Sequence, residues 1–339
     1  MQSKNKESEE WRMKGMDSLR GAFEGHQIAI YFGTVILAGL VGVLFPQAAS
    51  LELLVNPALA LMLFVTFLQV PLAELGRALS HVRFLAALLA ANFIVAPILV
   101  SILVQFAPVD AMIRLGILLV LLTPCIDYVV TFAHIGRADA RLLLAATPVL
   151  LILQMLLLPI YLSILLGEDA SGLVQLEPFI HAFVWLIAGP LALAAVIQVG
   201  AARNSAVASL SRALGLLPVP ATAAVLFVVV ASVSPQIGLS LDAALRVLPL
   251  YVVYAGVAPF LGWGISRLVG LDARAGRAVA FSAGTRNSLV VLPLAFAVPN
   301  AVPLLPAVIV TQTMVELVAS LAYMRLIPRL IKEKGKRPA

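Results

Sequence analysis

Residues 112–134 read MIRLGILLVLLTPCIDYVVTFAH. The stretch is long and apolar enough to cross a membrane as one helix, which takes about 20 residues. Its middle, however, holds Thr123-Pro124-Cys125-Ile126-Asp127, where Pro124 lacks a backbone N–H and opens a helix. Irregular backbone at membrane depth is tolerated only where it is buried in protein or lines a cavity. The stretch therefore predicts a membrane-spanning helix with an interruption that is enclosed by other helices.

The composition of the whole chain agrees with a membrane protein. Of its 339 residues 62% are hydrophobic and 12% charged, and the mean hydropathy is +1.04, whereas a soluble domain averages roughly 45–50% apolar and about 25% charged residues. A soluble globular enzyme, a disordered protein and a disulfide scaffold are thereby excluded. Ten apolar stretches are predicted to span the membrane: about 27–45, 52–70, 84–106, 112–134, 142–166, 178–200, 217–235, 243–266, 278–298 and 302–327.

The basic residues predict the orientation of these spans. With a cytoplasmic amino terminus, twenty of the 23 Lys and Arg fall inside, Arg114 and Arg246 fall outside, and Arg286 lies within span nine. This bias follows the positive-inside rule. It predicts a multi-pass protein of the cell (inner) membrane with both termini cytoplasmic. The net charge of +6 then reports topology, and no nucleic acid partner is expected.

Short tails are predicted on both sides of a transporter domain over residues 27–327. Residues 1–26 lack the apolar core and the small-residue cleavage site of a signal peptide. Their apolar residues recur at near-helical spacing, so the segment is either an interfacial helix or a solvated cytoplasmic tail. Residues 328–339 form a basic cytoplasmic tail.

A repeat accounts for the number of spans. Val95-Ala96-Pro97 in span three recurs as Val257-Ala258-Pro259 in span eight, five spans and 162 residues later. Two halves of five spans, about 27–166 and 178–327, must lie in opposite orientations because five is odd. The sequence thus predicts an all-α integral membrane protein of ten transmembrane helices in two inverted five-helix repeats, an architecture typical of secondary transporters.

The same offset carries Pro124 of span four onto Arg286 of span nine. Arg286 lies in the segment Ser282 to Ser288, SAGTRNS, whose small and hydroxylated residues around Gly284 predict a second interrupted helix. Freed backbone groups and half-helix ends at the two breaks can bind ions or polar substrates. Helices four and nine are therefore the expected place of the site.

Three charged residues lie well inside predicted spans: Asp127, Arg286 and Glu316. A charge at the bilayer centre costs about 2.5–3.5 kcal/mol on insertion scales, so it generally has a partner and a function. The repeat predicts that Asp127 and Arg286 face each other. They form either a static ion pair or a working pair in which Asp127 takes up a proton. Glu316 is either a second proton carrier or a partner of Arg286.

Cys125 is the only cysteine, which excludes an internal disulfide and a cysteine-rich metal site. A lone cysteine in an apolar helix is either a small hydrophobic residue or, beside a helix break, a soft ligand for a metal or metalloid. Walker, dinucleotide-binding, HExxH and Gly-x-Ser-x-Gly motifs are absent from the sequence. An enzyme or an ATP-driven pump is therefore not expected, and no cofactor is predicted.

The run LLTPCIDYVVTFAH at 121–134, followed by Gly136-Arg137-Ala138-Asp139 and Gln154, resembles spans four and five of the arsenical-resistance (arsenite efflux) permeases. These belong to the bile acid:sodium symporter superfamily. The resemblance extends to the segment 68–72, to Gly284-Thr285-Arg286-Asn287 and to Glu316. It implies a panel and a core domain, with spans four and nine crossing at their breaks. It also implies export of arsenite or trivalent antimony in exchange for protons, with Cys125 at the position of the cysteine that those permeases require.

The resemblance also sets expectations for the site. Sodium-coupled relatives place Glu and Gln near the crossing to hold two sodium ions, whereas Ser282 and Arg286 fall at those positions here. A fixed guanidinium repels sodium, so protons rather than sodium are the expected coupling ions. The predicted site comprises helix breaks at Pro124 and Gly284, substrate-binding residues Thr123, Cys125, Thr285, Arg286 and Asn287, and proton-coupling residues Asp127 and Glu316.

Three functions remain open at this point. The first is a secondary active transporter that exports arsenite or a related trivalent metalloid by proton-coupled alternating access. The second is an organic-anion transporter of bile acid or pantothenate type in which Arg286 binds a carboxylate. The third is a membrane sensor or scaffold without transport activity. In each case the lipid bilayer is the surrounding medium.

Overall fold

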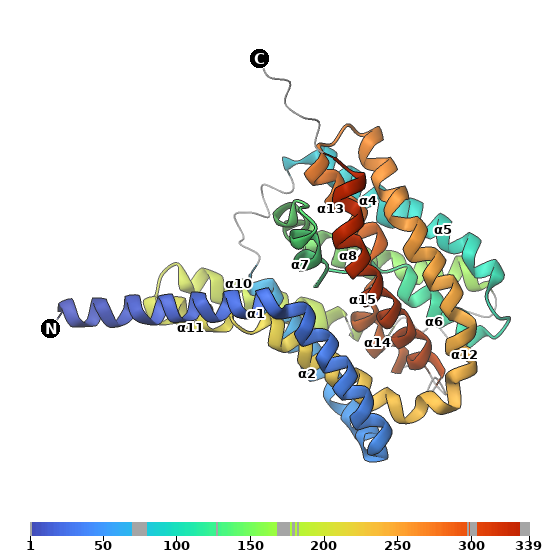
Figure 1. The fold of residues 1–339 in the computed structure, drawn as a ribbon, viewed down its shortest axis with the longest axis horizontal. Helices are drawn as coiled ribbons and strands as arrows, with labels where there is room; N and C mark the ends of the chain where they lie inside the picture. The colour runs from blue at the N-terminus through green and yellow to red at the C-terminus, as the bar shows by residue number, and fades with distance from the viewer. Residues whose placement is uncertain are drawn as a thin grey trace.

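The computed structural model describes residues 2–69, 80–126, 128–167, 177, 180–181, 183–296, 298 and 304–332. Every regular element in this part of the chain is a helix (Figure 1). The α-helices are α1 (Gln2–Leu44), α2 (Val55–Leu68), α4 (Val82–Ala90), α5 (Ala96–Leu103), α6 (Ala111–Leu121), α7 (Tyr128–Ile135), α8 (Ala140–Leu166), α10 (Gly189–Ala201), α11 (Ser205–Leu214), α12 (Pro218–Leu268), α13 (Ala273–Gly284), α14 (Ser288–Phe296) and α15 (Leu304–Leu330). Short 3-10 or π segments are η1 (Pro46–Leu54), η2 (Ala91–Val95), η3 (Val104–Phe106) and η5 (Phe183–Ala188).

Eight helical segments in the described part of the chain are long and apolar enough to cross a membrane. They coincide with eight of the predicted spans and identify a multi-pass membrane protein. Their bounds are Gly25–Leu44, Pro46–Leu68, Val82–Phe106, Ala140–Leu166, Val184–Ala201, Pro218–Pro235, Leu241–Leu268 and Leu304–Leu330. The two other predicted spans, 112–134 and 278–298, are each divided into two shorter helices, α6 with α7 and α13 with α14.

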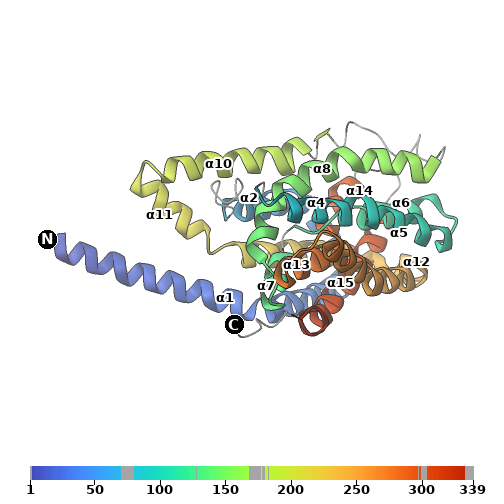
Figure 2. The same ribbon diagram turned by 90° about the horizontal axis from the view of Figure 1, so that it is seen from above.

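Two helices are longer than the spans predicted within them. Helix α1 begins at Gln2 and runs without interruption through the first span, so residues 2–26 and that span form one helix, whose amino-terminal end projects from the body (Figure 2). Helix α12 joins the predicted spans 217–235 and 243–266 in a single 51-residue helix that bends between them (Figure 1).

The helices form two groups that share α12 (Figures 1 and 2). In one group α1 and α2 pack on α12, and α10 packs on α2. The amide of Gln198 joins α10 to α2 by donating to the carbonyl oxygens of Phe67 and Leu68 at 3.1 and 3.2 Å. In the other group α13 and α15 pack on α12, while α4 to α8 surround α13 to α15. The second group contains both divided helices.

The repeated prolines produce a repeated contact. A proline at position i leaves the carbonyl of residue i−4 without its helical donor. For Pro97 this is Phe93, whose carbonyl accepts a hydrogen bond of 2.6 Å from the Tyr161 hydroxyl. For Pro259 it is Ala255, whose carbonyl accepts from the Tyr323 hydroxyl at 2.5 Å. Each residue of the second contact lies 162 positions after its counterpart in the first.

Gly262 and Gly264 form a matched test of helix packing within α12. A Cβ at Gly262 would stand 2.6 Å from the Cβ of Ala283 in α13, whereas a Cβ at Gly264 meets nothing within 4 Å. We expect Gly262→Ala to destabilise the protein by about 1–3 kcal/mol through overpacking. Gly264→Ala removes a helical glycine and is expected to be neutral or stabilising by up to about 1 kcal/mol. The melting temperatures of both purified variants in detergent measure the difference. Equal melting temperatures would contradict the close packing of α12 on α13.

Candidate substrate site at the helix crossing

The two divided helices cross at their breaks. The first break lies between Leu121 at the end of α6 and Tyr128 at the start of α7, and the second between Gly284 and Ser288. Pro124 and Arg286 form an antiparallel bridge. On one side of it the N–H of Cys125 donates to the carbonyl of Thr285 at 3.2 Å. On the other the N–H of Asn287 donates to the carbonyl of Thr123 at 2.8 Å. The crossing that the resemblance implied is therefore present.

Side chains at the breaks form hydrogen bonds with backbone groups at the ends of the half-helices. The hydroxyls of Thr123 and Thr285 donate to carbonyls four residues earlier, Leu119 and Phe281, at 3.0 and 2.9 Å. The amide oxygen of Asn287 accepts from the N–H of Val290 in the first turn of α14 at 3.2 Å, as a helix cap does. Four half-helix ends, two positive and two negative, thus meet at one point in the bundle.

Gly284 permits the close approach of the surrounding helices. A Cβ at this position would stand 2.6 Å from Cγ of Pro259 and 2.9 Å from Cε2 of Tyr323. Because these neighbours come from α12 and α15, the end of α13 is enclosed on both sides. The predicted break residue therefore has a packing role as well.

Arg286 is completely buried, with none of its surface exposed. Among the described residues, its guanidinium donates hydrogen bonds to uncharged groups only. The central carbon of the guanidinium stands 5.2 Å from the ring centroid of Tyr254 in α12, as in a cation–π contact. The four hydrogen-bond acceptors are Asn92 Oδ1 at 2.8 Å, Ala283 O at 2.7 Å, Ser282 O at 3.1 Å and Leu121 O at 3.4 Å. The amide of Asn92 in turn donates to Ser282 Oγ at 2.9 Å. The charge is thus enclosed by oxygen atoms from three separate helices and by an aromatic face.

Glu316 in α15 is bound to the same break through the main chain. Its Oε2 accepts from the backbone N–H of Arg286 and from the amide of Gln312, each at 2.6 Å. Among the described residues Oε1 has no hydrogen-bond partner, although the carboxylate is 1% exposed. The predicted association with Arg286 therefore exists, but it involves the backbone of Arg286 and not its guanidinium.

Asp127 lies outside the described residues, so its predicted pairing with Arg286 and its role in proton coupling stay predictions.

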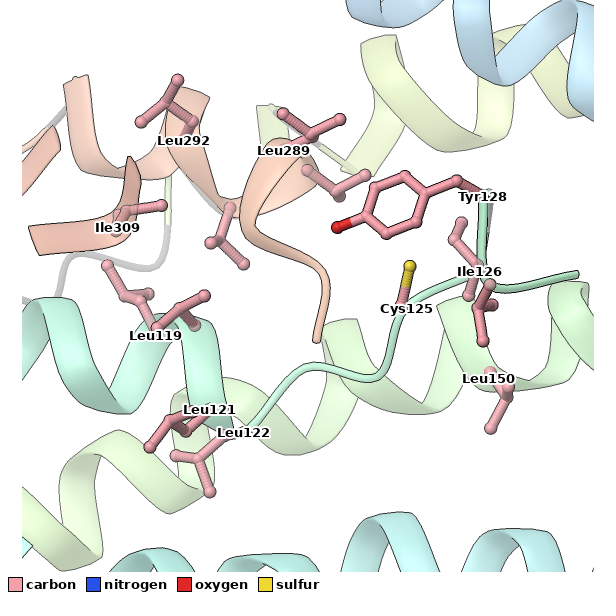
Figure 3. Close-up of a cluster of buried hydrophobic side chains, with 14 of the residues drawn as sticks. Leu119, Leu121, Leu122, Cys125, Ile126, Tyr128, Leu150, Leu289, Leu292 and Ile309 are labelled. Carbon is pink, nitrogen blue, oxygen red and sulfur yellow. The ribbon is translucent and has the colours of Figure 1, made fainter. Parts of the chain in front are cut away.

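The side chain of Cys125 is buried, with 1% of its surface exposed. Its sulfur points into the space next to the ring of Tyr128, with Ile126 and Leu289 nearby (Figure 3). No group of three or more His, Cys, Asp or Glu that could hold a metal ion occurs in the described parts of the chain. The thiol is thus a single soft atom at the edge of the crossing.

A partly polar cavity of about 70 Å³ lies between the two helix groups and reaches the first break at Tyr128. Tyr128 and Thr131 of α7 form one wall, and the opposite walls include Gln27 of α1, Thr66 of α2 and Thr222 of α12. A larger groove of about 580 Å³ lies between α12 and α15, but its lining from Leu248 to Ile331 is almost wholly apolar. Of these two spaces, the smaller one has the larger share of polar lining.

Comparison with known proteins identifies the family. The model of the sodium bile acid symporter family matches residues 56–242, more than half of the chain. The chain belongs to the sodium bile acid symporter family. A search of curated proteins finds no match. Membership makes this chain a membrane transporter and agrees with the prediction that it is not an enzyme.

Two residues that hold the crossing of this sodium bile acid symporter family member were not singled out from sequence: Asn92 and Tyr254. Asn92 binds both Arg286 and Ser282. The available signal was its place five residues before Pro97. Tyr254 lies 162 positions after Asn92 and five before Pro259. The repeat could therefore have paired both residues with the site.

Proposed function

We propose that this chain is a secondary active transporter that exports arsenite or a related trivalent metalloid by proton-coupled alternating access. The observation that supports this proposal is the position of its one thiol. Cys125 follows a proline break and bonds through its backbone to the second break. Tyr128, three residues after it, lines a cavity of about 70 Å³, large enough for a small solute only. Soft thiol ligands favour soft metalloids, and one thiol gives the reversible binding that a transporter requires.

The size of the polar cavity and the bonding of Arg286 argue against an organic-anion substrate. Pockets that enclose drug-sized organic molecules measure about 300–1,000 Å³, and the polar cavity measures about 70 Å³. Nη1 and Nη2 of Arg286 donate to protein oxygens, Nε has no partner among the described residues, and the whole side chain is buried. It therefore has no exposed face with which to bind a carboxylate.

An inverted repeat of two five-helix halves is part of this proposal. Its support is the offset of 162 residues, which relates the contact of Pro97 and Tyr161 to that of Pro259 and Tyr323. Two halves of opposite orientation allow one crossing to be opened to either side of the membrane, with the two helix groups as the moving parts.

Protons rather than sodium are the proposed coupling ions. The oxygen atoms of Asn92, Ser282 and Ala283 form the kind of oxygen-lined site that hard cations favour. The guanidinium of Arg286 already occupies it. Because this covalently held charge cannot leave, we propose that Asp127 and Glu316 take up and release the coupling protons.

Cys125→Ser tests the substrate. In everted membrane vesicles, whose lumen corresponds to the outside of the cell, the wild-type protein is expected to accumulate arsenite under a pH gradient. Cys125→Ser is expected to abolish this accumulation, because a hydroxyl is a hard ligand for a soft metalloid. Ile126→Val, the next buried residue, is the matched control and is expected to retain it. Unchanged accumulation by Cys125→Ser would refute the metalloid assignment. Absence of any arsenite flux in wild-type proteoliposomes would favour a sensor or scaffold.

A further inference from the structure

The contacts at the crossing come in pairs whose members lie 162 residues apart. The bond from Cys125 N to Thr285 O has its counterpart in the bond from Asn287 N to Thr123 O. The hydroxyl bonds of Thr123 and Thr285 are related in the same way. Each residue near the first break therefore has a structural counterpart near the second, and a difference between counterparts is informative.

The counterpart of Glu316 is Gln154 in α8. Glu316 accepts a hydrogen bond from the backbone N–H of Arg286. The counterpart of Arg286 is Pro124, which has no N–H to donate. The second partner of Glu316 is Gln312, whose counterpart is the apolar Leu150. Both partners that satisfy Glu316 are thus missing around Gln154.

Gln154 nevertheless lies on the face of α8 that packs against the first break. The hydroxyl of Thr147 donates to the carbonyl of Ile126 at 3.5 Å, and Leu150 lies close to Ile126 (Figure 3). Gln154 follows Leu150 by four residues, so it belongs to the same helix face. The repeat relates Gln154 to Pro124 as Glu316 is related to Arg286, and Cys125 directly follows Pro124.

The amide of Gln154 has no hydrogen-bond partner within the described parts of the protein. The residue is 1% exposed, and both Nε2 and Oε1 are unpaired. Other intramembrane amides differ: Asn92 and Gln198 bond to neighbouring helices. An unpaired buried amide costs about 1–3 kcal/mol, so a partner from outside the protein is expected.

We propose that Gln154 is a substrate-binding residue that hydrogen-bonds the hydroxyl groups of a small neutral metalloid hydroxide while Cys125 binds its central atom. This assignment rests on the proposed function. Arsenous acid supplies O–H donors and oxygen acceptors, which match the amide N–H and carbonyl of Gln154. The thiol of Cys125 forms a sulfur–arsenic bond, its proton leaves with one hydroxyl group as water, and hydrolysis reverses the step. The remaining hydroxyl groups stay available to Gln154.

The substitution Gln154→Leu separates substrate binding from a structural role. Replacing an unpaired buried amide by an apolar side chain of similar size should leave the melting temperature unchanged or raise it. The apparent dissociation constant for arsenite, measured from its stabilisation of the purified protein in detergent, should rise about tenfold to a hundredfold. Met155→Leu, the adjacent buried residue, is the matched control and should change neither quantity.

Each other result overturns the assignment. A melting temperature of Gln154→Leu several degrees below that of the wild type would mean that the amide has a partner in the protein. An unchanged arsenite affinity would mean that Gln154 does not contact the substrate, while the proposed function would stand if Cys125→Ser abolished binding. If arsenite stabilised the wild type and Cys125→Ser equally, or neither of them, the metalloid function itself would fail.

Discussion

Replacing Arg286 by glutamine is expected to abolish sodium-independent transport. The guanidinium is completely buried and donates to Asn92 Oδ1, to the carbonyls of Ser282 and Ala283 and to that of Leu121. Removing the guanidinium leaves these buried acceptors without a donor, and each unsatisfied buried acceptor costs about 1–3 kcal/mol. Because those partners join both breaks to the third span, the crossing itself should lose its geometry.

The same substitution should create a dependence on sodium. Without the guanidinium, the oxygen atoms that surrounded it are free to coordinate a hard cation. We therefore expect Arg286→Gln to recover part of its arsenite accumulation in sodium chloride and none in choline chloride. Accumulation by the wild type should be the same in both salts. Arg286→Lys keeps the charge but lacks the planar fork of donors, and it should retain intermediate activity without any response to sodium.

An exposed arginine serves as the control for these variants. Arg246 forms an ion pair of 2.8 Å with Asp242, but both side chains are more than half exposed. Such surface pairs contribute about 0–1 kcal/mol, so Arg246→Gln should transport as the wild type does. Undiminished sodium-independent transport by Arg286→Gln would contradict the proposal that its guanidinium replaces a bound cation.

The features predictable from sequence are those that depend on local chemistry or on the repeat. Pro124 and Gly284 predicted both breaks because proline cannot donate and small residues allow irregular backbone. The offset of 162 made Pro124 and Arg286 equivalent positions, and the two residues form the antiparallel bridge at the crossing. Apolar length predicted the eight long spans, since burial in lipid requires about 20 apolar residues whatever the tertiary structure.

The partners of the buried charges depend on long-range packing, which the sequence pattern does not specify. Arg286 was expected to bind a carboxylate, yet its described partners are an amide, main-chain carbonyls and the ring of Tyr254. Nothing local to Asn92 distinguishes an amide that joins two helices from one that holds a charge. The sequence also predicted two separate spans, 217–235 and 243–266, where the structure has the single helix α12.

Glu316→Gln is expected to uncouple transport from the proton gradient. The carboxylate connects α15 to the second break by accepting from the backbone N–H of Arg286 and from Gln312. A glutamine oxygen can still accept from that N–H, so the crossing should stay folded. A glutamine side chain, however, cannot bind and release a proton. Downhill arsenite exchange should therefore continue, while accumulation against a gradient in acid-loaded everted vesicles should be lost.

Ser320→Ala controls for disturbance of the same helix face, because Ser320 lies one turn after Glu316 and is fully buried. Its hydroxyl has no hydrogen-bond partner among the described residues, so its removal should change neither exchange nor accumulation.

If Glu316→Gln still accumulated arsenite in response to the pH gradient, Glu316 would have only a structural role at the second break. The coupling proton would then have to bind elsewhere, and Asp127→Asn would be the decisive variant. Loss of exchange as well as accumulation in Glu316→Gln would instead show that the carboxylate charge is needed to hold the crossing together, since the hydrogen bond to Arg286 alone would not be sufficient.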